Sequence, residues 1–216
     1  MDIPNESELT DYCDVRQQLD ALGKDVQDVT NHPNYCLPFL TSGRLAKAKI
    51  PNSHSDSPYI DYGWGVVCNF RKIIPDKTAL KESASLVKAP EYIVELLVAT
   101  ATEGLSSKPH QPISYSHAHG PSDTSSFPPP YIPGISVGKP QALILPIRLT
   151  CLNGLSTLKI YLPKNLKDAD QRETALKTLN EIKKRFSGII PLLDPINDMH
   201  IQDEKFKNLI KVRIRW

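Results

Sequence analysis

The chain has 216 residues, with 26 Lys and Arg against 24 Asp and Glu and a formal net charge of +2. This length suits one ordinary domain or two small ones, and so small a net charge excludes binding to nucleic acid through overall charge alone. No apolar run approaches the ~20 residues needed to span a bilayer, and residues 1–12 lack the basic and apolar regions of a secretion signal. We therefore expect a soluble protein, with 19 Pro stiffening its loops.

The first predicted element is a helix of about twenty residues near the N-terminus. Its apolar residues recur at alternating spacings of three and four, as in a helix that packs against another helix: Tyr12, Val15, Leu19, Leu22, Val26 and Val29. Ser7 or Thr10 caps its start. Pro33 ends it, because a proline ring disfavours helical conformation in the preceding residue.

The pattern then changes to the alternation of half-buried strands, predicted at residues 44–50, 65–73, 92–101, 142–150 and 158–162. In the last of these, Leu158, Ile160 and Leu162 share one face, and Lys159 and Tyr161 the other. Asn153-Gly154 is typical of a hairpin turn, and Pro146 indicates an edge strand or a bulge. Five short strands predict a small barrel.

A second helical stripe comprises Ala175, Leu179, Ile182 and Phe186, followed by Ser187-Gly188 as a stop signal. We expect it to pair antiparallel with the first helix. Residues 103–140 form a proline-rich loop, and a short helix ends the chain. The resulting domain prediction is a stalk helix at 1–34, a barrel at 35–167 and C-terminal stalk helices at 168–216, as in a module inserted into a larger protein.

Familiar catalytic and metal-binding motifs give no enzyme prediction. Residues 134–139 lack the spacing and hydroxyl of a phosphate-binding loop, and their match to a serine-nucleophile motif lies in a proline-rich loop. His117 and His119 have no third metal ligand nearby in sequence. Asp194 and Asp198 flank turn-forming residues. Four scattered cysteines indicate reduced, mostly buried thiols. We expect no cofactor, no metal and no catalytic residue.

Basic residues on the predicted strands are the more promising feature. Between residues 139 and 167 the chain has five basic residues and no acidic one. A lysine on an exposed strand ordinarily only keeps the protein soluble, but converging cations would bind an anionic ligand. Arg44 follows Ser42-Gly43 at the mouth of a strand, where its guanidinium can offer two parallel hydrogen bonds to a carboxylate or phosphate. The candidates for phosphate and base contacts are Lys47, Lys49, Arg71, Lys72, Arg148, Tyr161 and Lys164.

Five segments resemble the arch of the nuclear exosome-associated DExH-box RNA helicase of TRAMP-type adaptor complexes, and they span nearly the whole chain. They are Tyr62–Phe70, Phe39–Leu45, Leu158–Leu166, Lys184–Ile196 and Ile201–Asp203. Where the family usually has arginine, this chain has Lys159 and Lys167, and Asn165 replaces an acid. A lysine keeps the charge but loses the planar fork, so we expect a divergent paralogue.

The resemblance implies an α+β fold in which a small SH3-like KOW barrel is inserted between antiparallel stalk helices. It also implies a nuclear, non-catalytic module of an ATP-dependent RNA helicase, within a multi-protein exosome-targeting complex. The implied partners are adaptor proteins with short Leu-Phe-x-x-x-Asp-like motifs. Carried across, Arg44 pairs with the aspartate, Lys159 and Lys167 assist, and Trp64 and Phe70 contribute apolar contacts, although large aromatics in a small barrel are more often core.

Two hypotheses follow from these residues. In the first the module docks adaptor peptides, and in the second it binds structured RNA and guides it into the helicase. Peptide binding depends on single side chains of the motif. RNA binding falls steeply with salt.

Overall fold

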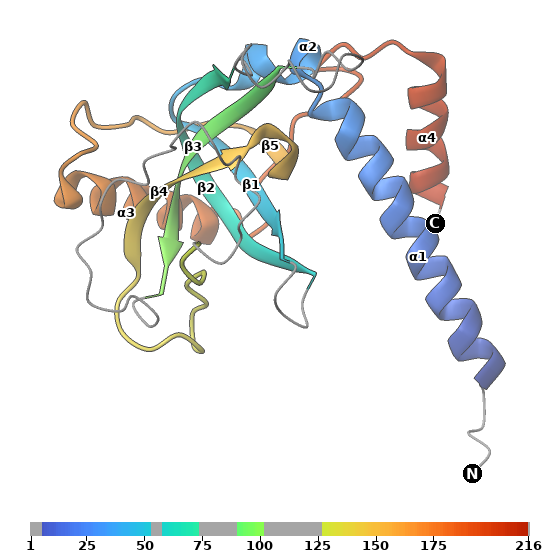
Figure 1. The fold of residues 1–216 in the computed structure, drawn as a ribbon, viewed down its shortest axis with the longest axis horizontal. Coiled ribbons are helices and arrows are strands. Elements are labelled where there is room, and N and C mark those ends of the chain that lie inside the picture. Colours follow the sequence, from blue (N-terminus) through green and yellow to red (C-terminus); the bar gives the residue numbers. More distant parts are fainter. Residues whose placement is uncertain (1–5, 53–57, 74–89, 102–126, 216) are drawn as a thin grey trace, which may run out of the picture. The chain divides into compact units, whose positions relative to one another are not determined.

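The computed structural model describes residues 6–52, 58–73, 90–101 and 127–215 (Figure 1). The chain forms two compact units, one of residues 1–38 with 193–216 and one of residues 39–192. Each unit brings together segments that are distant in sequence, because the chain leaves the first unit after residue 38 and returns to it at residue 193.

The first unit is helical. It contains α1 (Glu6–Thr30), the short α2 (Pro33–Cys36) and α4 (Glu204–Arg215). In Figure 1, α1 and α4 lie side by side and run in opposite directions, and they are in contact. The predicted end of the first helix is confirmed, since α1 stops at Thr30 and Pro33 opens the next helix. Val26 and Phe206 are buried, while Tyr12, at the start of the predicted stripe, is 59% exposed.

The second unit is built on one antiparallel sheet with strand order β4-β3-β2-β1-β5. The strands are β1 (Arg44–Pro51), β2 (Tyr59–Ile73), β3 (Glu91–Thr100), β4 (Gln141–Arg148) and β5 (Leu152–Lys159). The 3₁₀ turn η1 (Leu37–Phe39) precedes β1 along the chain, and η4 (Leu149–Cys151) joins β4 to β5. Pro146 lies in edge strand β4, as predicted. Within the described residues β4 and β5 do not pair, so the sheet is open where the sequence predicts a closed barrel.

The last strand begins earlier than the sequence predicts. Asn153-Gly154 lies inside β5 and makes no turn there. Gly154 has a φ of 137°, and a Cβ on it would lie 2.9 Å from a methyl carbon of Leu192, so this glycine allows a close approach of residue 192. The predicted alternation is confirmed all the same. Ile160 is buried with Leu158 and Leu162 packed near it, whereas Lys159 and Tyr161 are exposed.

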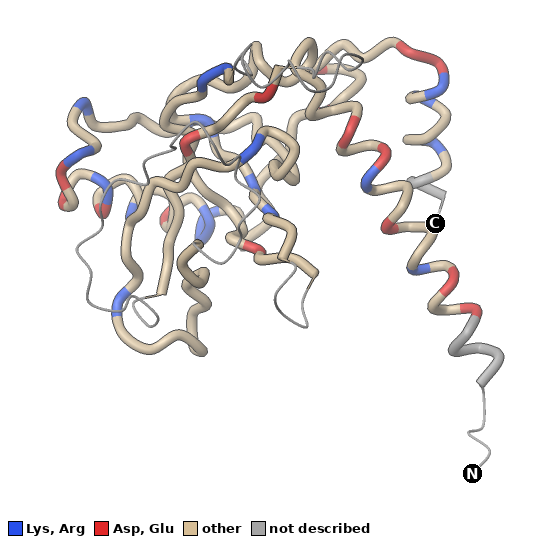
Figure 2. Tube along the Cα trace, in the orientation of Figure 1, with Lys and Arg blue, Asp and Glu red and all other residues tan. Residues whose placement is uncertain are grey.

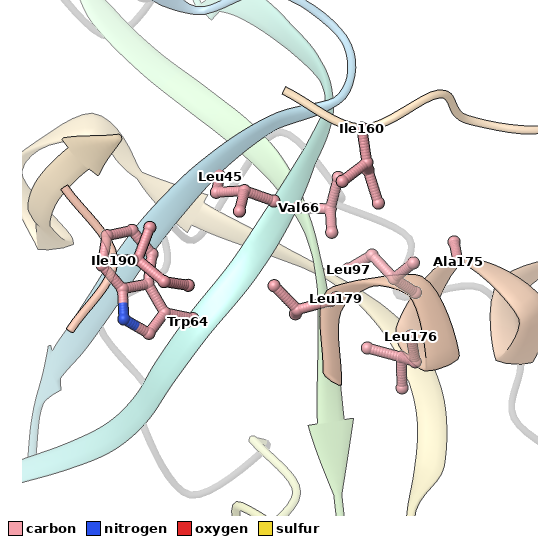
Figure 3. Close-up of a cluster of buried hydrophobic side chains, with 9 residues drawn as sticks. All are labelled: Leu45, Trp64, Val66, Leu97, Ile160, Ala175, Leu176, Leu179 and Ile190. Carbon is pink, nitrogen blue, oxygen red and sulfur yellow. The ribbon is translucent and has the colours of Figure 1, made fainter. Parts of the chain in front are cut away.

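Helix α3 (Ala169–Arg185) packs on the sheet. It is the predicted second helix, and Gly188, with a φ of 81°, follows its end as predicted. Its apolar face does not pair with α1 as expected, because Ala175, Leu176 and Leu179 point into a core formed with the sheet (Figure 3). The other buried members of that core are Leu45, Trp64, Val66, Leu97, Ile160 and Ile190. The antiparallel partner of α1 is α4 instead, so residues 169–192 belong to the sheet unit, although the sequence assigns them to the stalk.

Several other predictions concern loops. His117 and His119 lie outside the described residues, as does most of the predicted loop at 103–140. Asp194 is a turn residue as predicted, because its carboxylate accepts hydrogen bonds from the backbone N–H groups of Ile196 and Asn197 at 2.7 and 3.0 Å. Over the described ranges, no helix is long and apolar enough to cross a membrane, and no group of His, Cys, Asp and Glu is suited to hold a metal ion.

Candidate functional site

Arg44 is positioned by a tight turn at the start of β1. The backbone N–H of Arg44 donates to the carbonyl of Thr41 at 3.0 Å, and Gly43 has a φ of 87°, which favours glycine. A Cβ on Gly43 would overlap the carbonyl oxygen of Ile160. Gly43 also donates its N–H to Val67 and accepts from the N–H of Ile160, both at 2.8 Å. The turn therefore ties the start of β1 to β2 and to the end of β5.

The side chain of Arg44 is fixed by three backbone carbonyls. Its Nε donates to the oxygen of Phe39 at 3.1 Å, and its Nη1 donates to the oxygens of Ser156 and Thr157 at 3.1 and 3.0 Å. The residue is only 8% exposed. The guanidinium is therefore held in one orientation before any ligand arrives, and its charge is largely removed from water.

No carboxylate neutralises this guanidinium within the described part of the chain. Arg44 takes part in none of the ion pairs found there, and its Nη2 makes no hydrogen bond to a described residue. Burial lowers the pKa of Arg44 from its ordinary value. The charge is nonetheless retained at neutral pH, because arginine starts from so high a pKa. A buried cation without a counter-ion favours an anionic ligand.

Lys159 lies beside Arg44. The two residues are direct partners in the antiparallel pairing of β1 with β5, so their side chains leave the same face of the sheet. Lys159 is exposed, and Tyr161, two residues further on, is 81% exposed. The structure thus brings together two of the three cations that the resemblance assigns to a peptide.

Lys164 and Lys167 are exposed in the segment between β5 and α3. Arg172, which is not among the residues that the sequence predicts, fixes this segment. Its Nη1 donates to the oxygens of Leu166 and Lys167 at 3.0 and 2.8 Å, and its Nε donates to Ala142 on β4 at 2.9 Å. Helix position alone gave no signal for this role, because the three acceptors are backbone atoms.

The two predicted aromatics lie on opposite faces of the sheet. Leu45 pairs with Val66, so Arg44 and Val67 lie on the same face of the sheet. Val67 pairs with Leu96 and Phe70 pairs with Val94, so Phe70 lies on that face too. Phe70 is half-buried. Trp64 is 6% exposed in the core under α3 (Figure 3). Phe70 therefore shares a face of the sheet with Arg44, and Trp64 is a core residue.

The predicted phosphate contacts are divided between several places. Lys47 is half-buried on the α3 face with its Nζ 5.0 Å from the centroid of the Trp64 ring, and Lys49 forms an ion pair of 3.7 Å with Asp61. Arg71 is seven residues from Trp64 along β2, roughly 20 Å at the rise of a strand. Figure 2 shows basic positions on several separate stretches of this unit.

Arg71 and Arg148 lie on one face, on either side of Ile93, whereas Lys72 leaves the opposite face. Glu91 lies 3.9 Å from Arg148, which places an acid among these cations. The register therefore gathers Arg44, Lys159 and Phe70 on one face, but it does not gather all the predicted RNA contacts into a single track.

Comparison with known proteins places this chain in a family. The family described as "Mtr4-like, beta-barrel domain" matches residues 32–215. Exosome RNA helicase MTR4 from Homo sapiens and that from Mus musculus are each 36% identical over 209 residues, which is 97% of this chain. ATP-dependent RNA helicase mtr4 from Schizosaccharomyces pombe is 33% identical over the same share of the chain. The chain corresponds to 17% of the length of each of these relatives. The chain belongs to the family of Mtr4-like β-barrel domains.

Proposed function

We propose that this chain is the non-catalytic arch and KOW module of a nuclear, exosome-associated RNA helicase, and that it docks short Leu-Phe-x-x-x-Asp-like motifs of adaptor proteins. The names of the relatives support the helicase and exosome parts of this proposal. The match to the family of Mtr4-like β-barrel domains supports the arch part.

The observation that carries the docking proposal is the state of Arg44. Three carbonyls orient its guanidinium, burial strips it of water, and no described carboxylate pairs with it. An incoming aspartate supplies the missing charge without having to order the arginine, so little conformational entropy is lost on the protein side. Half-buried Phe70, on the same face, supplies apolar surface for the motif.

The test is a calorimetric titration of peptides carrying the motif. The aspartate peptide is expected to bind, and a peptide with Asn at that position is expected to lose about tenfold or more in affinity, because the charged hydrogen bond is lost. Lys159→Gln should weaken binding of the aspartate peptide. Its matched control is Lys177→Gln, which removes a charge from the exposed side of α3. Equal affinities for the Asp and Asn peptides would contradict the proposal.

Arg44→Glu is unsuited to this titration. The resemblance to the helicase arch suggests that this variant abolishes peptide binding without unfolding the barrel. The substitution would, however, leave the carbonyls of Phe39, Ser156 and Thr157 facing a carboxylate. Lys159 is exposed, so its substitution removes charge without removing such bonds.

A second function, RNA binding, is favoured by one observation. Tyr161 is 81% exposed, and exposed Lys159 and Lys164 flank it in sequence. Exposed aromatics that stack on bases beside cations are the usual features of single-strand binding. RNA binding predicts a log-log salt slope of about 0.7 per neutralised phosphate and a loss of affinity in Tyr161→Ala.

A further inference from the structure

Two like charges face each other across the β1–β5 pair. Arg44 and Lys159 are direct register partners, and side chains directly opposite in an antiparallel pair have Cβ atoms about 4.5–5.5 Å apart. The two cationic side chains therefore leave the sheet from adjacent positions on one face.

No carboxylate of the described residues pairs with either cation. The ion pairs of this unit involve Lys49, Arg148, Lys177 and Lys184, and neither Arg44 nor Lys159 is among them. The surrounding sequence adds positive charge, because residues 139–167 contain five basic residues, Lys159 among them, and no acidic one. The guanidinium is oriented by its three carbonyls, while Lys159 is exposed and free to turn toward a ligand.

One carboxylate neutralises only one of these two cations. We propose that the Arg44–Lys159 pair prefers a peptide group with two negative charges, either a phosphoserine or two adjacent aspartates, over a single aspartate. This inference rests on the proposed docking function and specifies the chemistry of its ligand. A phosphoserine carries about −1.5 to −2 charges at pH 7 and three acceptor oxygens, which suits a fixed guanidinium beside a mobile ammonium group.

The test uses the full chain and four peptides that differ only at the acidic position, which is Asn, Asp, phosphoserine or Asp-Asp. Affinities are measured by calorimetry at low and high salt. Phosphoserine is expected to bind about tenfold more tightly than Asp, since it gains a second charge-assisted contact, and the gain should shrink as salt screens the exposed lysine. Comparing the phosphoserine and Asp-Asp peptides shows which source of charge fits the pair.

The Lys159→Gln variant tests whether Lys159 binds the second negative charge of the peptide. In this variant the advantage of phosphoserine over Asp is expected to disappear, while Asp still binds better than Asn. Lys177→Gln, the matched control on α3, should preserve the advantage. Thermal unfolding of each variant checks that the fold is retained.

The outcomes separate this inference from the function on which it rests. Equal binding of Asp and phosphoserine, with both tighter than Asn, would overturn the preference and leave the docking function intact. Equal binding of all four peptides would overturn the docking function itself. A competition experiment with single-stranded RNA provides the last outcome. If RNA bound the Arg44–Lys159 pair more tightly than the phosphopeptide and displaced it, the pair would be assigned to RNA phosphates, and the peptide preference would be wrong.

Discussion

Arg44 has a structural role as well as the proposed binding role. Its three hydrogen bonds join η1, β1 and β5, and a lysine cannot reproduce their forked geometry. We expect Arg44→Lys to lower the free energy of unfolding by about 1.5–3 kcal/mol, the range for a hydrogen bond to a charged group. Urea denaturation measures the change. Arg185→Lys, at the exposed end of α3, is the control. An Arg44→Lys variant as stable as the native protein would mean that these bonds contribute little.

The four cysteines differ in their expected reactivity. Burial raises the pKa of the Cys36 and Cys68 thiols to about 12, and it raises the pKa of Cys151. At pH 8 a thiol with such a pKa is a thiolate only about once in 10⁴ molecules. Cys13 is exposed. Intact-mass analysis after brief iodoacetamide treatment of the native protein should show one adduct, which Cys13→Ser removes. Several rapid adducts would contradict this burial.

At the residue scale, the alternation of apolar and polar residues predicts which side chains face the core, but the sequence does not predict which side chains bind backbone carbonyls. The pattern of residues 158–162 correctly predicts that Lys159 and Tyr161 leave the core face. The anchoring of Arg44 could not be predicted, because Ser156 is 112 residues away in sequence and offers a backbone oxygen that any residue possesses. The same reason hides Arg172.

At the scale of elements, the sequence predicts helix α3 and its end but not its partner. A stripe of apolar residues three and four apart shows that one side of a helix is buried. It does not distinguish a second helix from a sheet, because both present an apolar surface. The predicted start of β5 is wrong for a related reason. Asn-Gly usually marks a turn, but here Gly154 lies inside the strand and makes room for Leu192.

The packing of α3 on the sheet predicts a large effect at Leu179. This side chain is fully buried among residues of α3 and the sheet (Figure 3). Leu179→Ala should lower the free energy of unfolding by about 2–5 kcal/mol, the range for deleting a buried leucine. Lys177→Ala is the control on the same helix. It loses only the exposed 3.5 Å ion pair with Glu173 and should change stability by less than about 1 kcal/mol. Chemical denaturation of both variants measures the difference.

At the scale of the whole molecule, the boundaries of the two units could not be predicted from the chain order of helices and strands. The sequence places a boundary at 167/168, before the second helix, because it assigns both helices to one stalk. The structure divides the chain at 38/39 and 192/193. Residues 189–192 follow α3 back to β5, where Leu192 bridges Ser156 and the Ser156 hydroxyl donates to the oxygen of Pro191 at 2.8 Å.

The division at 192/193 predicts which fragment folds by itself. A fragment of residues 39–192 contains every buried member of the core under α3, and we expect it to unfold cooperatively on heating. A fragment of residues 39–167 lacks Ala175, Leu176, Leu179 and Ile190, so Leu45, Trp64, Val66 and Leu97 would face water. We expect this shorter fragment to lose its cooperative transition and to bind a hydrophobic dye. Circular dichroism and dye fluorescence compare the two. A cooperative transition in the 39–167 fragment would show that the sheet does not need α3, and it would restore the boundary that the sequence predicts.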